Sequence, residues 1–275
     1  MNQDCYSRSY YEGLQSGSLR SAEVVAPLVL GLISARSVVD VGCGVGAWLA
    51  AFQKSGVDDI WGIDGDYVDA SILQIPRSRF QGADLSKPLV LNRTFDLAIS
   101  LEVAEHLPPD CAARFVDSLT RLAPVVLFSA AIPFQGGNHH VNEQWPDFWA
   151  ALFEAHKYLA IDCIRKRIWE NEAVEWWYAQ NTLLFVRADA LESHPALQAE
   201  QARTDPAQLR LVHPGQFLHS EALHRYELTG AQNPGVRSAS RTLIASLKSA
   251  IRRRLRPARS AQAAPVNATS HRPKA

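Results

Sequence analysis

The sequence has few cysteines and no long apolar run, and each shortage excludes a class of protein. Its 275 residues include four cysteines, and none of them forms a Cys-x-x-Cys pair. This argues against a zinc ribbon or a disulfide scaffold and suits a reducing compartment. No apolar run approaches the roughly 18 residues that a membrane-spanning helix needs. The first residues, MNQDCYSRSYYEG, also lack the basic-then-apolar pattern of a signal peptide. We therefore expect a cytoplasmic protein.

The sequence has no net charge either, but its charges are unevenly distributed. Lysine and arginine together number 28, as do aspartate and glutamate. Ten of the basic residues and none of the acidic ones fall within residues 236–275, so the chain before this tail is acidic. Residues 240–256 predict a basic amphipathic helix. Such a helix could contact an anionic membrane peripherally, touch nucleic acid without specificity, or pack on the acidic body. We predict no specific nucleic-acid partner.

Short β-branched and apolar segments alternate with helical patterns along most of the chain. The strands are expected at residues 38–41, 59–64, 79–85, 94–101, 123–131, 158–168 and 181–186. The helices are expected at residues 21–33, 47–54, 109–122 and 147–156. Such alternation is typical of an α/β fold with a parallel sheet covered on both faces.

We expect four segments along the chain. They are an N-terminal helical cap or lid (1–36), a central domain (37–187), peripheral helices and loops (188–235), and the basic helix with a disordered tail (236–275).

A glycine-rich stretch, SVVDVGCGVGAW at residues 37–48, follows the first expected strand. In such a sheet, ligands bind at the carboxyl ends of the strands, and glycines there let backbone N–H groups approach a ligand closely. Asp64 ends the second expected strand, where a carboxylate can accept both ribose hydroxyl protons. These features predict a nucleoside-containing ligand, but they also occur in dinucleotide-binding enzymes.

Three stretches in this order resemble class I S-adenosylmethionine-dependent methyltransferases. Asp40-Val-Gly42-Cys-Gly44-Val-Gly46 looks like motif I of that family, and GADL (82–85) and FDLAISLEVAEHLPP (95–109) resemble its later motifs. The resemblance covers residues 37–186. It implies a Rossmann-like fold with a mostly parallel seven-stranded sheet, helices on both faces, and S-adenosyl-L-methionine as cofactor. It further implies cofactor contacts from Asp40, Gly42, Gly44, Gly46, Asp64, Gly65, Asp84, Leu85, Leu101 and Glu102.

The stretch FSAAIPFQGGNHHVNEQWPDFW, residues 128–149, follows the fifth expected strand and should open onto the same crevice. A hydroxyl acceptor needs a base, and we predict His140 or His139 as that base, assisted by Glu143. Trp145 and Trp149 would offer flat faces to a sugar ring. The alternative is an ordinary loop with its tryptophans in the core. His106 is a further candidate base, or simply a histidine at a helix start.

Other features near the expected crevice leave alternatives open. A divalent ion held by His139, His140 and Glu143 would match no strong metal signature, so we predict no metal site. The aromatic run at residues 176–178 could line the acceptor site or pack a β-hairpin, and packing is favoured. Tyr10 and Tyr11 could form a lid over the cofactor, with Arg20 reaching its carboxylate.

The sequence therefore predicts a methyltransferase that acts on a small or glycan-like hydroxylated acceptor, by O-methylation. One alternative is an NAD-dependent oxidoreductase or epimerase, which is disfavoured because the chain lacks a Tyr-x-x-x-Lys pair. The other is a non-catalytic scaffold that retains the methyltransferase fold.

Overall fold

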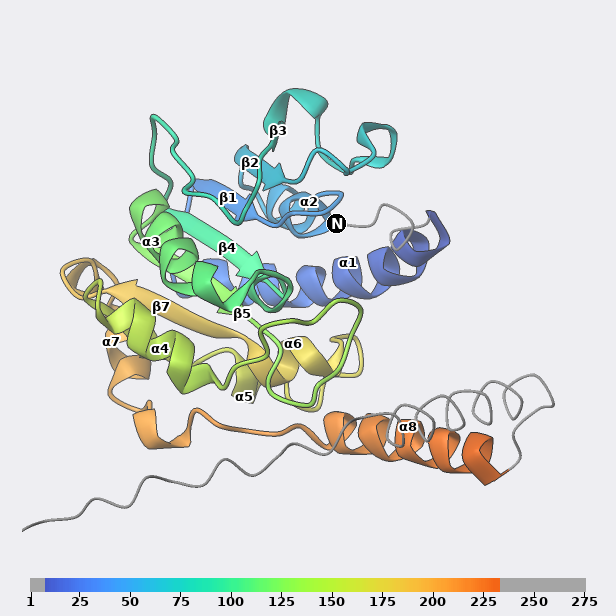
Figure 1. Cartoon of the computed structure of the whole chain (residues 1–275). Coiled ribbons are helices and arrows are strands. Elements are labelled where there is room, and N and C mark those ends of the chain that lie inside the picture. The colour runs from blue at the N-terminus through green and yellow to red at the C-terminus, as the bar shows by residue number, and fades with distance from the viewer. Residues whose placement is uncertain (1–7, 233–275) are drawn as a thin grey trace, which may run out of the picture. The chain divides into compact units, whose positions relative to one another are not determined.

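The structure is a computed structural model that describes residues 8–232, with side chains from residue 17 to residue 225 except residue 223 (Figure 1). The described chain divides between Glu221 and Ala222 into two units, and the sheet and the site discussed below lie in the first. Residues 240–256, the predicted basic helix, lie outside the described residues, so their membrane contact stays a prediction. Among residues 8–232, no helix combines the length and hydropathy needed to cross a bilayer.

A seven-stranded sheet organises the first unit, as predicted. The strands are β1 (Ser37–Val41), β2 (Asp59–Asp64), β3 (Phe80–Gly82), β4 (Leu97–Leu101), β5 (Val125–Ser129), β6 (Tyr158–Ile161) and β7 (Leu183–Arg187). Their order across the sheet is β3-β2-β1-β4-β5-β7-β6. The neighbouring pairs are parallel except those of β7, which is antiparallel to both β5 and β6. The order reverses beside β1, between β1 and β4, which is where open α/β sheets bind their ligands.

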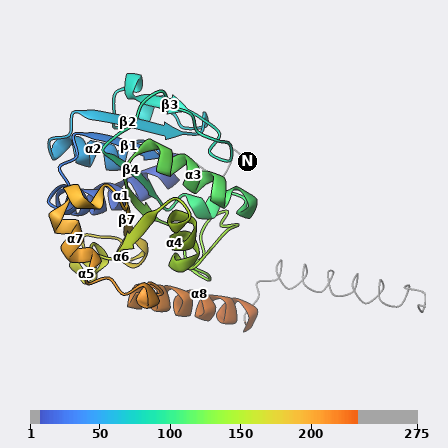
Figure 2. The same ribbon diagram turned by 90° about the vertical axis from the view of Figure 1, so that its left-hand side faces the viewer.

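Helices cover both faces of this sheet (Figure 2). The α-helices are α1 (Arg8–Leu30), α2 (Ala47–Lys54), α3 (Ala112–Leu122), α4 (Pro146–Glu154), α5 (Arg165–Ile168), α6 (Trp176–Asn181), α7 (Pro195–Gln201) and α8 (Pro214–Gln232). Short 3-10 helices occur at Ala70–Ile72, Arg77–Arg79, Ala104–His106, Pro109–Cys111, Leu191–Ser193 and Pro206–Gln208.

Alternate side chains of each strand enter two separate apolar clusters. In β1, Val38 packs with α1 and α2, whereas Val39 packs with α3 and α4. This follows from the strand period of two, which sends successive side chains to opposite faces. Val25 and Val29 of α1 lie in the same cluster as α2, so the described part of the N-terminal segment belongs to the core of the unit.

Two sequence predictions about local structure are wrong. The strand expected over residues 158–168 ends at Ile161, and the chain turns into α5. The turn is held by Arg165, whose buried guanidinium pairs with Asp162 and also donates to the Gln180 and Leu209 carbonyls. The aromatic run at residues 176–178 packs no β-hairpin, because it forms helix α6.

Candidate active site

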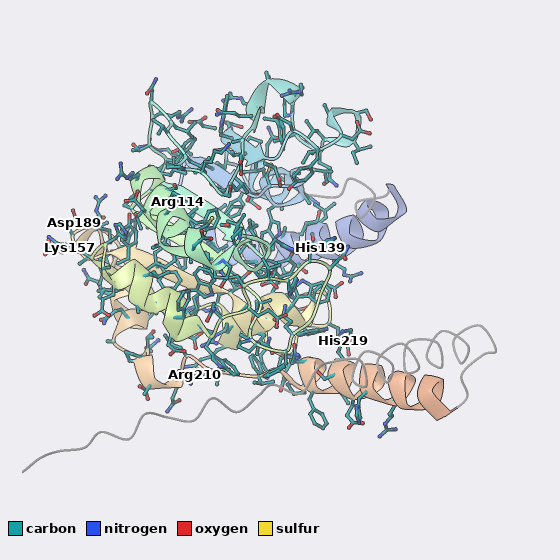
Figure 3. All side chains as sticks on the ribbon, viewed as in Figure 1. Arg114, His139, Lys157, Asp189, Arg210 and His219 are labelled. Carbon is teal, nitrogen blue, oxygen red and sulfur yellow. The ribbon has the colours of Figure 1, made fainter. Side chains whose placement is uncertain are left out.

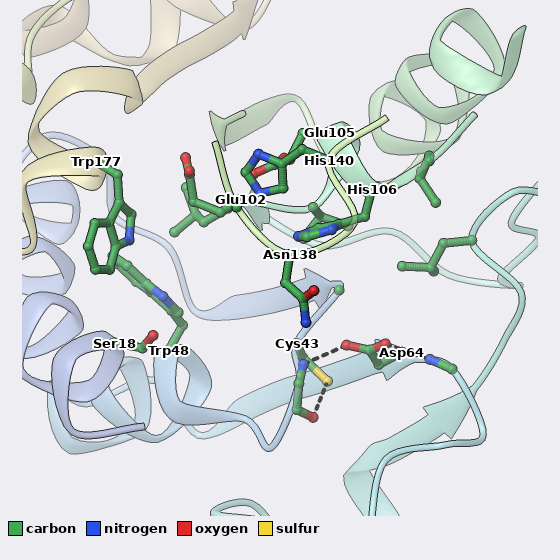
Figure 4. Close-up of a pocket in the computed structure, with 18 of the residues that line it drawn as sticks. Ser18, Cys43, Trp48, Asp64, Glu102, Glu105, His106, Asn138, His140 and Trp177 are labelled. Atoms are coloured by element: carbon green, nitrogen blue, oxygen red, sulfur yellow. Dashed lines mark hydrogen bonds between the residues drawn. The ribbon is translucent and has the colours of Figure 1, made fainter. Parts of the chain in front are cut away.

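A pocket of about 630 Å³ opens at the carboxyl ends of β1, β2 and β4 (Figure 4). Its lining contains most of the residues that the sequence assigned to the cofactor: Gly42, Gly44, Asp64, Gly65, Asp84, Leu85, Leu101 and Glu102. Asp40 and Gly46 lie outside the set of described residues that line it. The pocket therefore joins the three motifs, as expected of neighbouring parallel strands.

The glycine loop brings bare backbone to the pocket at two positions. Gly42 and Gly44 have φ angles of 89° and 53°, in the left-handed region that glycine adopts without strain. A Cβ on Gly42 would come within 2.3 Å of the Val103 side chain. A Cβ on Gly44 would meet no atom of the described chain within 4 Å. The loop is thus tightly packed at Gly42 and open to a ligand at Gly44.

Asp64 fastens this loop to the end of β2. Its Oδ2 accepts a hydrogen bond from the Gly44 N–H, and its Oδ1 accepts from the Gly65 N–H and the Tyr67 hydroxyl, each at 2.6 Å. Burial raises the pKa of Asp64, and the three hydrogen bonds oppose that rise. Such a carboxylate, lining the pocket, is suited to accept hydrogen bonds from ribose hydroxyls.

Asp40 and Asp84 occupy opposite environments. Asp40 is 3 % exposed, and its Oδ2 has no hydrogen-bond partner among the described residues. Burial, followed by the charge of Asp64, raises the pKa of Asp40 well above its ordinary value. Asp84 is exposed at the pocket rim, and hydrogen bonds from Ser86 and Lys87 lower its pKa. Asp84 can therefore contact a polar group of a ligand, whereas Asp40 is buried behind the pocket lining.

Glu102, just after β4, lies in a network of amides on the far wall of the pocket. Its φ of 56° is left-handed, which is uncommon for a residue with a side chain. Gln135 Nε2 and Asn181 Nδ2 donate to its carboxylate at 2.9 and 3.0 Å. Asn181 and Gln180 both donate to Gln135 Oε1 as well. Burial raises the pKa of Glu102, and these hydrogen bonds oppose the rise. Three segments of the chain thereby hold one carboxyl group at the pocket wall.

Next to Glu102, the structure gathers Glu105, His106 and His140. One ligand-type atom from each lies within 4.8 Å of the others. The rings of His106 and His140 meet edge to face, with centroids 4.9 Å apart. Burial, then the neighbouring His140, lowers the pKa of His106 to about 4, so this ring is neutral at pH 7. The predicted base His140 and the alternative base His106 are thus brought together.

Glu143, which we predicted to assist a histidine base, lies behind His140. Its Oε1 is 3.0 Å from His140 Nδ1 and also accepts from the Gly136 N–H at 2.8 Å. Its Oε2 accepts from the Phe134 N–H at 2.8 Å. The carboxylate of Glu143 therefore orients the imidazole of His140 and also binds two backbone N–H groups of the loop that contains His140.

His139 is placed differently from its neighbour. It has a left-handed φ of 59° and an exposed side chain (Figure 3), and it lies outside the described residues that line the pocket. Successive residues in such a turn face different ways, so only one of the two histidines enters the site. Arg20 likewise lies outside that lining and pairs with Glu175 Oε1 at 2.8 Å. The side chains of Tyr10 and Tyr11, the predicted lid, lie outside the described residues.

The aromatic wall of the pocket is not the one that we expected. Trp149 is 2 % exposed and packs on Phe128 in the core, and Trp145 lies outside the described residues that line the pocket. Helix α4 turns its apolar face toward the sheet, which places Trp149 inside. The aromatic residues that line the pocket are instead Trp48, Tyr67, Trp176, Trp177 and Tyr178.

Sequence reasoning missed several residues of this wall. Glu105 had a signal, because it follows Glu102 by three residues in EVAEHLPP and is a second acid after the same strand. Ser18, Gln135 and His219 line the pocket from α1, the loop after β5 and α8. They had no local signal, because their positions depend on how distant segments pack.

Comparisons with known proteins identify the family of this chain. A family profile described as a methyltransferase domain matches residues 19–192, well over half of the chain. The sugar N-methyltransferase KedS8 from Streptoalloteichus sp. ATCC 53650 has a similar fold, with a TM-score of 0.52 and 17% identity. That match covers 65% of this chain and 91% of the other. Magnesium protoporphyrin IX methyltransferase from Synechocystis PCC 6803 aligns with a TM-score of 0.48 and 16% identity, over 68% and 91% of the two chains. No curated protein sequence matches.

The fold and the pocket define a class I methyltransferase. The chain belongs to the methyltransferase-domain family, and it is an S-adenosyl-L-methionine-dependent methyltransferase. This assignment replaces the two alternative hypotheses from the sequence, an NAD-dependent oxidoreductase or epimerase and a non-catalytic scaffold.

Proposed function

We propose that this enzyme methylates a hydroxyl oxygen of a small polyhydroxylated acceptor such as a sugar, and that His140 takes the hydroxyl proton. The observation that carries the proposal is the His140–Glu143 pair at the pocket wall, with Nδ1 and Oε1 3.0 Å apart. The acceptor class is inferred from the aromatic and amide groups that share the wall.

The cofactor would be held by the residues of the glycine loop and the strand ends that line the pocket. Asp64 would accept from the ribose hydroxyls, Asp84 and Leu85 would border the base, and Leu101 and Glu102 would border the reacting end. The open space beside Gly44, where a Cβ would meet nothing within 4 Å, fits a close ligand approach. Asp40 and Gly46 would lie beneath the cofactor, outside the described pocket lining. S-adenosyl-L-methionine supplies an electrophilic methyl group on its sulfonium sulfur.

His140 would act on the acceptor, because a neutral hydroxyl is a weak nucleophile. Glu143 accepts from Nδ1–H and so keeps the lone pair of His140 on Nε2, the nitrogen that faces Gly137. This Nε2 would take the hydroxyl proton as the acceptor oxygen replaces the cofactor's sulfur on the methyl carbon. An amine acceptor that is already neutral would not need this step.

The acceptor would lie between the histidines and the half-buried Trp176 and Trp177. Flat indole faces pack well on the C–H faces of a sugar ring, and neighbouring polar groups bind its hydroxyls. Asn138, which also lines the pocket, supplies such a group.

The test is a methyl-transfer assay over a panel of sugars, amino sugars and other hydroxylated small molecules, with formation of S-adenosylhomocysteine as the readout. With an accepted substrate, His140→Gln should lower kcat by roughly 100- to 10,000-fold. Its affinity for S-adenosylhomocysteine should stay unchanged. His139→Gln is the matched control, because its side chain lies outside the pocket lining, and it should retain activity. Methylation confined to amino groups, or equal losses in both variants, would refute the proposal.

A further inference from the structure

We propose that Glu105, His106 and His140 form a binding site for one divalent transition-metal ion. The three residues come from two segments, the short helix after β4 and the loop after β5. They contribute one carboxylate and two imidazoles, and one potential ligand atom from each lies within 4.8 Å of the others. Two ligands that bind one tetrahedral ion at about 2.1 Å lie roughly 3.4 Å apart, so a pair of these atoms near the 4.8 Å limit must draw together by about 1.4 Å when the ion binds.

Glu105 supplies the first independent observation. Its side chain is fully buried, and both carboxylate oxygens lack a hydrogen-bond partner among the described residues. A buried carboxyl group without a partner either keeps its proton or binds a cation, and the neighbouring carboxyl group of Glu102 makes a negative charge here still more costly. Glu105 also lines the pocket, and the groups that cover its carboxylate oxygens must shift for an ion to reach them from solvent.

The two histidines supply the second observation. His106 Nδ1 is buried and has no hydrogen-bond partner in the described part of the chain. His140 Nδ1 is held by Glu143, which leaves Nε2 free to bind an ion. A histidine that binds a metal through one nitrogen commonly donates from the other to a carboxylate, as His140 does here. Glu143 itself is fixed by two backbone N–H groups, so this orientation is built into the loop.

The ligand set selects the kind of ion. Two imidazoles and a carboxylate suit Zn²⁺, Mn²⁺, Fe²⁺ or Co²⁺, whereas Mg²⁺ and Ca²⁺ prefer sites made only of oxygen ligands. Three protein ligands leave coordination positions open on the pocket side. This is the arrangement of a catalytic rather than a purely structural metal site.

The role of the ion rests on the proposed function, whereas its binding does not. An ion at this place would coordinate the acceptor hydroxyl and lower that hydroxyl's pKa. The lone pair of His140 Nε2 is then on the metal, so the hydroxyl proton goes to water as the oxygen bonds the methyl carbon and the carbon–sulfur bond breaks. Without the ion, His140 takes this proton itself.

The experiment is a titration of the untagged, chelator-treated full chain with Co²⁺, followed by its visible absorption. We expect one ion per chain with nitrogen and oxygen ligands. Glu105→Gln and His106→Gln should each weaken Co²⁺ binding by more than Glu143→Gln does, and Glu143→Gln should weaken it roughly 10-fold. The neighbouring control His139→Gln should bind as tightly as the unchanged chain. Binding of S-adenosylhomocysteine, measured for each variant, shows that it is folded.

The outcomes separate this site from the proposed function. Absence of a one-to-one Co²⁺ complex, or equal Co²⁺ affinity in the folded Glu105→Gln, His106→Gln and His139→Gln variants, overturns the metal site. It leaves hydroxyl methylation with His140 as the base untouched. Specific Co²⁺ binding together with methyl transfer only to amino groups would instead support the site and overturn the proposed acceptor.

Discussion

The carboxylate of Asp64 accepts a hydrogen bond of 2.6 Å from the backbone N–H of Gly44, so the end of β2 holds the glycine loop that follows β1. The same carboxylate accepts from Gly65 and Tyr67, which places one charged group at the junction of two loops. We therefore expect Asp64 to determine both the affinity for the cofactor and the shape of the glycine loop.

Replacing Asp64 with alanine should weaken S-adenosylhomocysteine binding by roughly 10- to 100-fold, the effect of losing one charged hydrogen bond. It also leaves the Gly44 and Gly65 N–H groups without their acceptor. Tyr67→Phe is the matched control, because it removes only the hydroxyl bond and keeps both backbone contacts. Isothermal titration calorimetry compares the two. A larger loss for Tyr67→Phe than for Asp64→Ala would contradict this account.

Gly44→Asp should abolish cofactor binding while leaving the protein folded. The new side chain would extend from a Cβ that meets no described atom within 4 Å, into the space that we assign to the ligand. Gly56→Asp is the control, because Gly56 also has a positive φ and open surroundings, but it lies outside the described pocket lining. Both substitutions should cost roughly 1–2 kcal/mol in backbone strain. If calorimetry shows that Gly44→Asp retains affinity for S-adenosylhomocysteine, our placement of the cofactor is wrong.

Trp149→Ala should affect the stability of the protein, whereas Trp177→Ala should affect its binding of the acceptor. Trp149 is buried against Phe128, so its removal should lower the free energy of unfolding by about 3–5 kcal/mol. Trp177 is half-buried at the pocket, so its removal should mainly raise the KM for the acceptor. Chemical denaturation and steady-state kinetics on both variants check this. A normal acceptor KM in Trp177→Ala would remove this indole from the acceptor site.

Asp40→Asn should make the protein more stable at neutral pH and flatten its pH dependence. Burial raises the pKa of Asp40 in the folded state, so between the unfolded pKa near 4 and the folded pKa the native state binds more protons. The contribution of this group to stability is therefore present at low pH and is lost as pH rises through that window. Asparagine cannot ionise, so the Asp40→Asn protein should not lose this stability as the pH rises.

Thermal unfolding between pH 4 and pH 8 measures this effect. Asp58→Asn, which removes an exposed carboxylate just before β2, should leave the profile unchanged. An Asp40→Asn protein that loses stability at pH 7 relative to pH 5 as steeply as the unchanged chain would show that Asp40 is not the group responsible.

Much of the fold was predictable because its signals are local. The run of β-branched residues before Asp40 and the glycines after it predict a strand and a tight turn whatever the rest of the chain does. Helix α2 runs over residues 47–54 as expected, since Gly56 ends it. The strand expected over residues 158–168 failed because a buried ion pair of Arg165 and Asp162 interrupts it, and apolar periodicity does not report such a pair.

The sequence by itself determined the sheet, the glycine loop and the family, because those depend on short-range patterns of apolar, glycine and acidic residues. Only the tertiary structure decided which histidine enters the pocket. His139 and His140 are adjacent in the sequence, and the left-handed backbone at His139 sends their side chains in different directions. The tertiary structure also decided that Trp149 packs inside while Trp177 lines the site, and that Glu105 and His106 meet His140. These outcomes depend on contacts between segments distant in the chain, and such contacts are made only when the helices pack on the sheet.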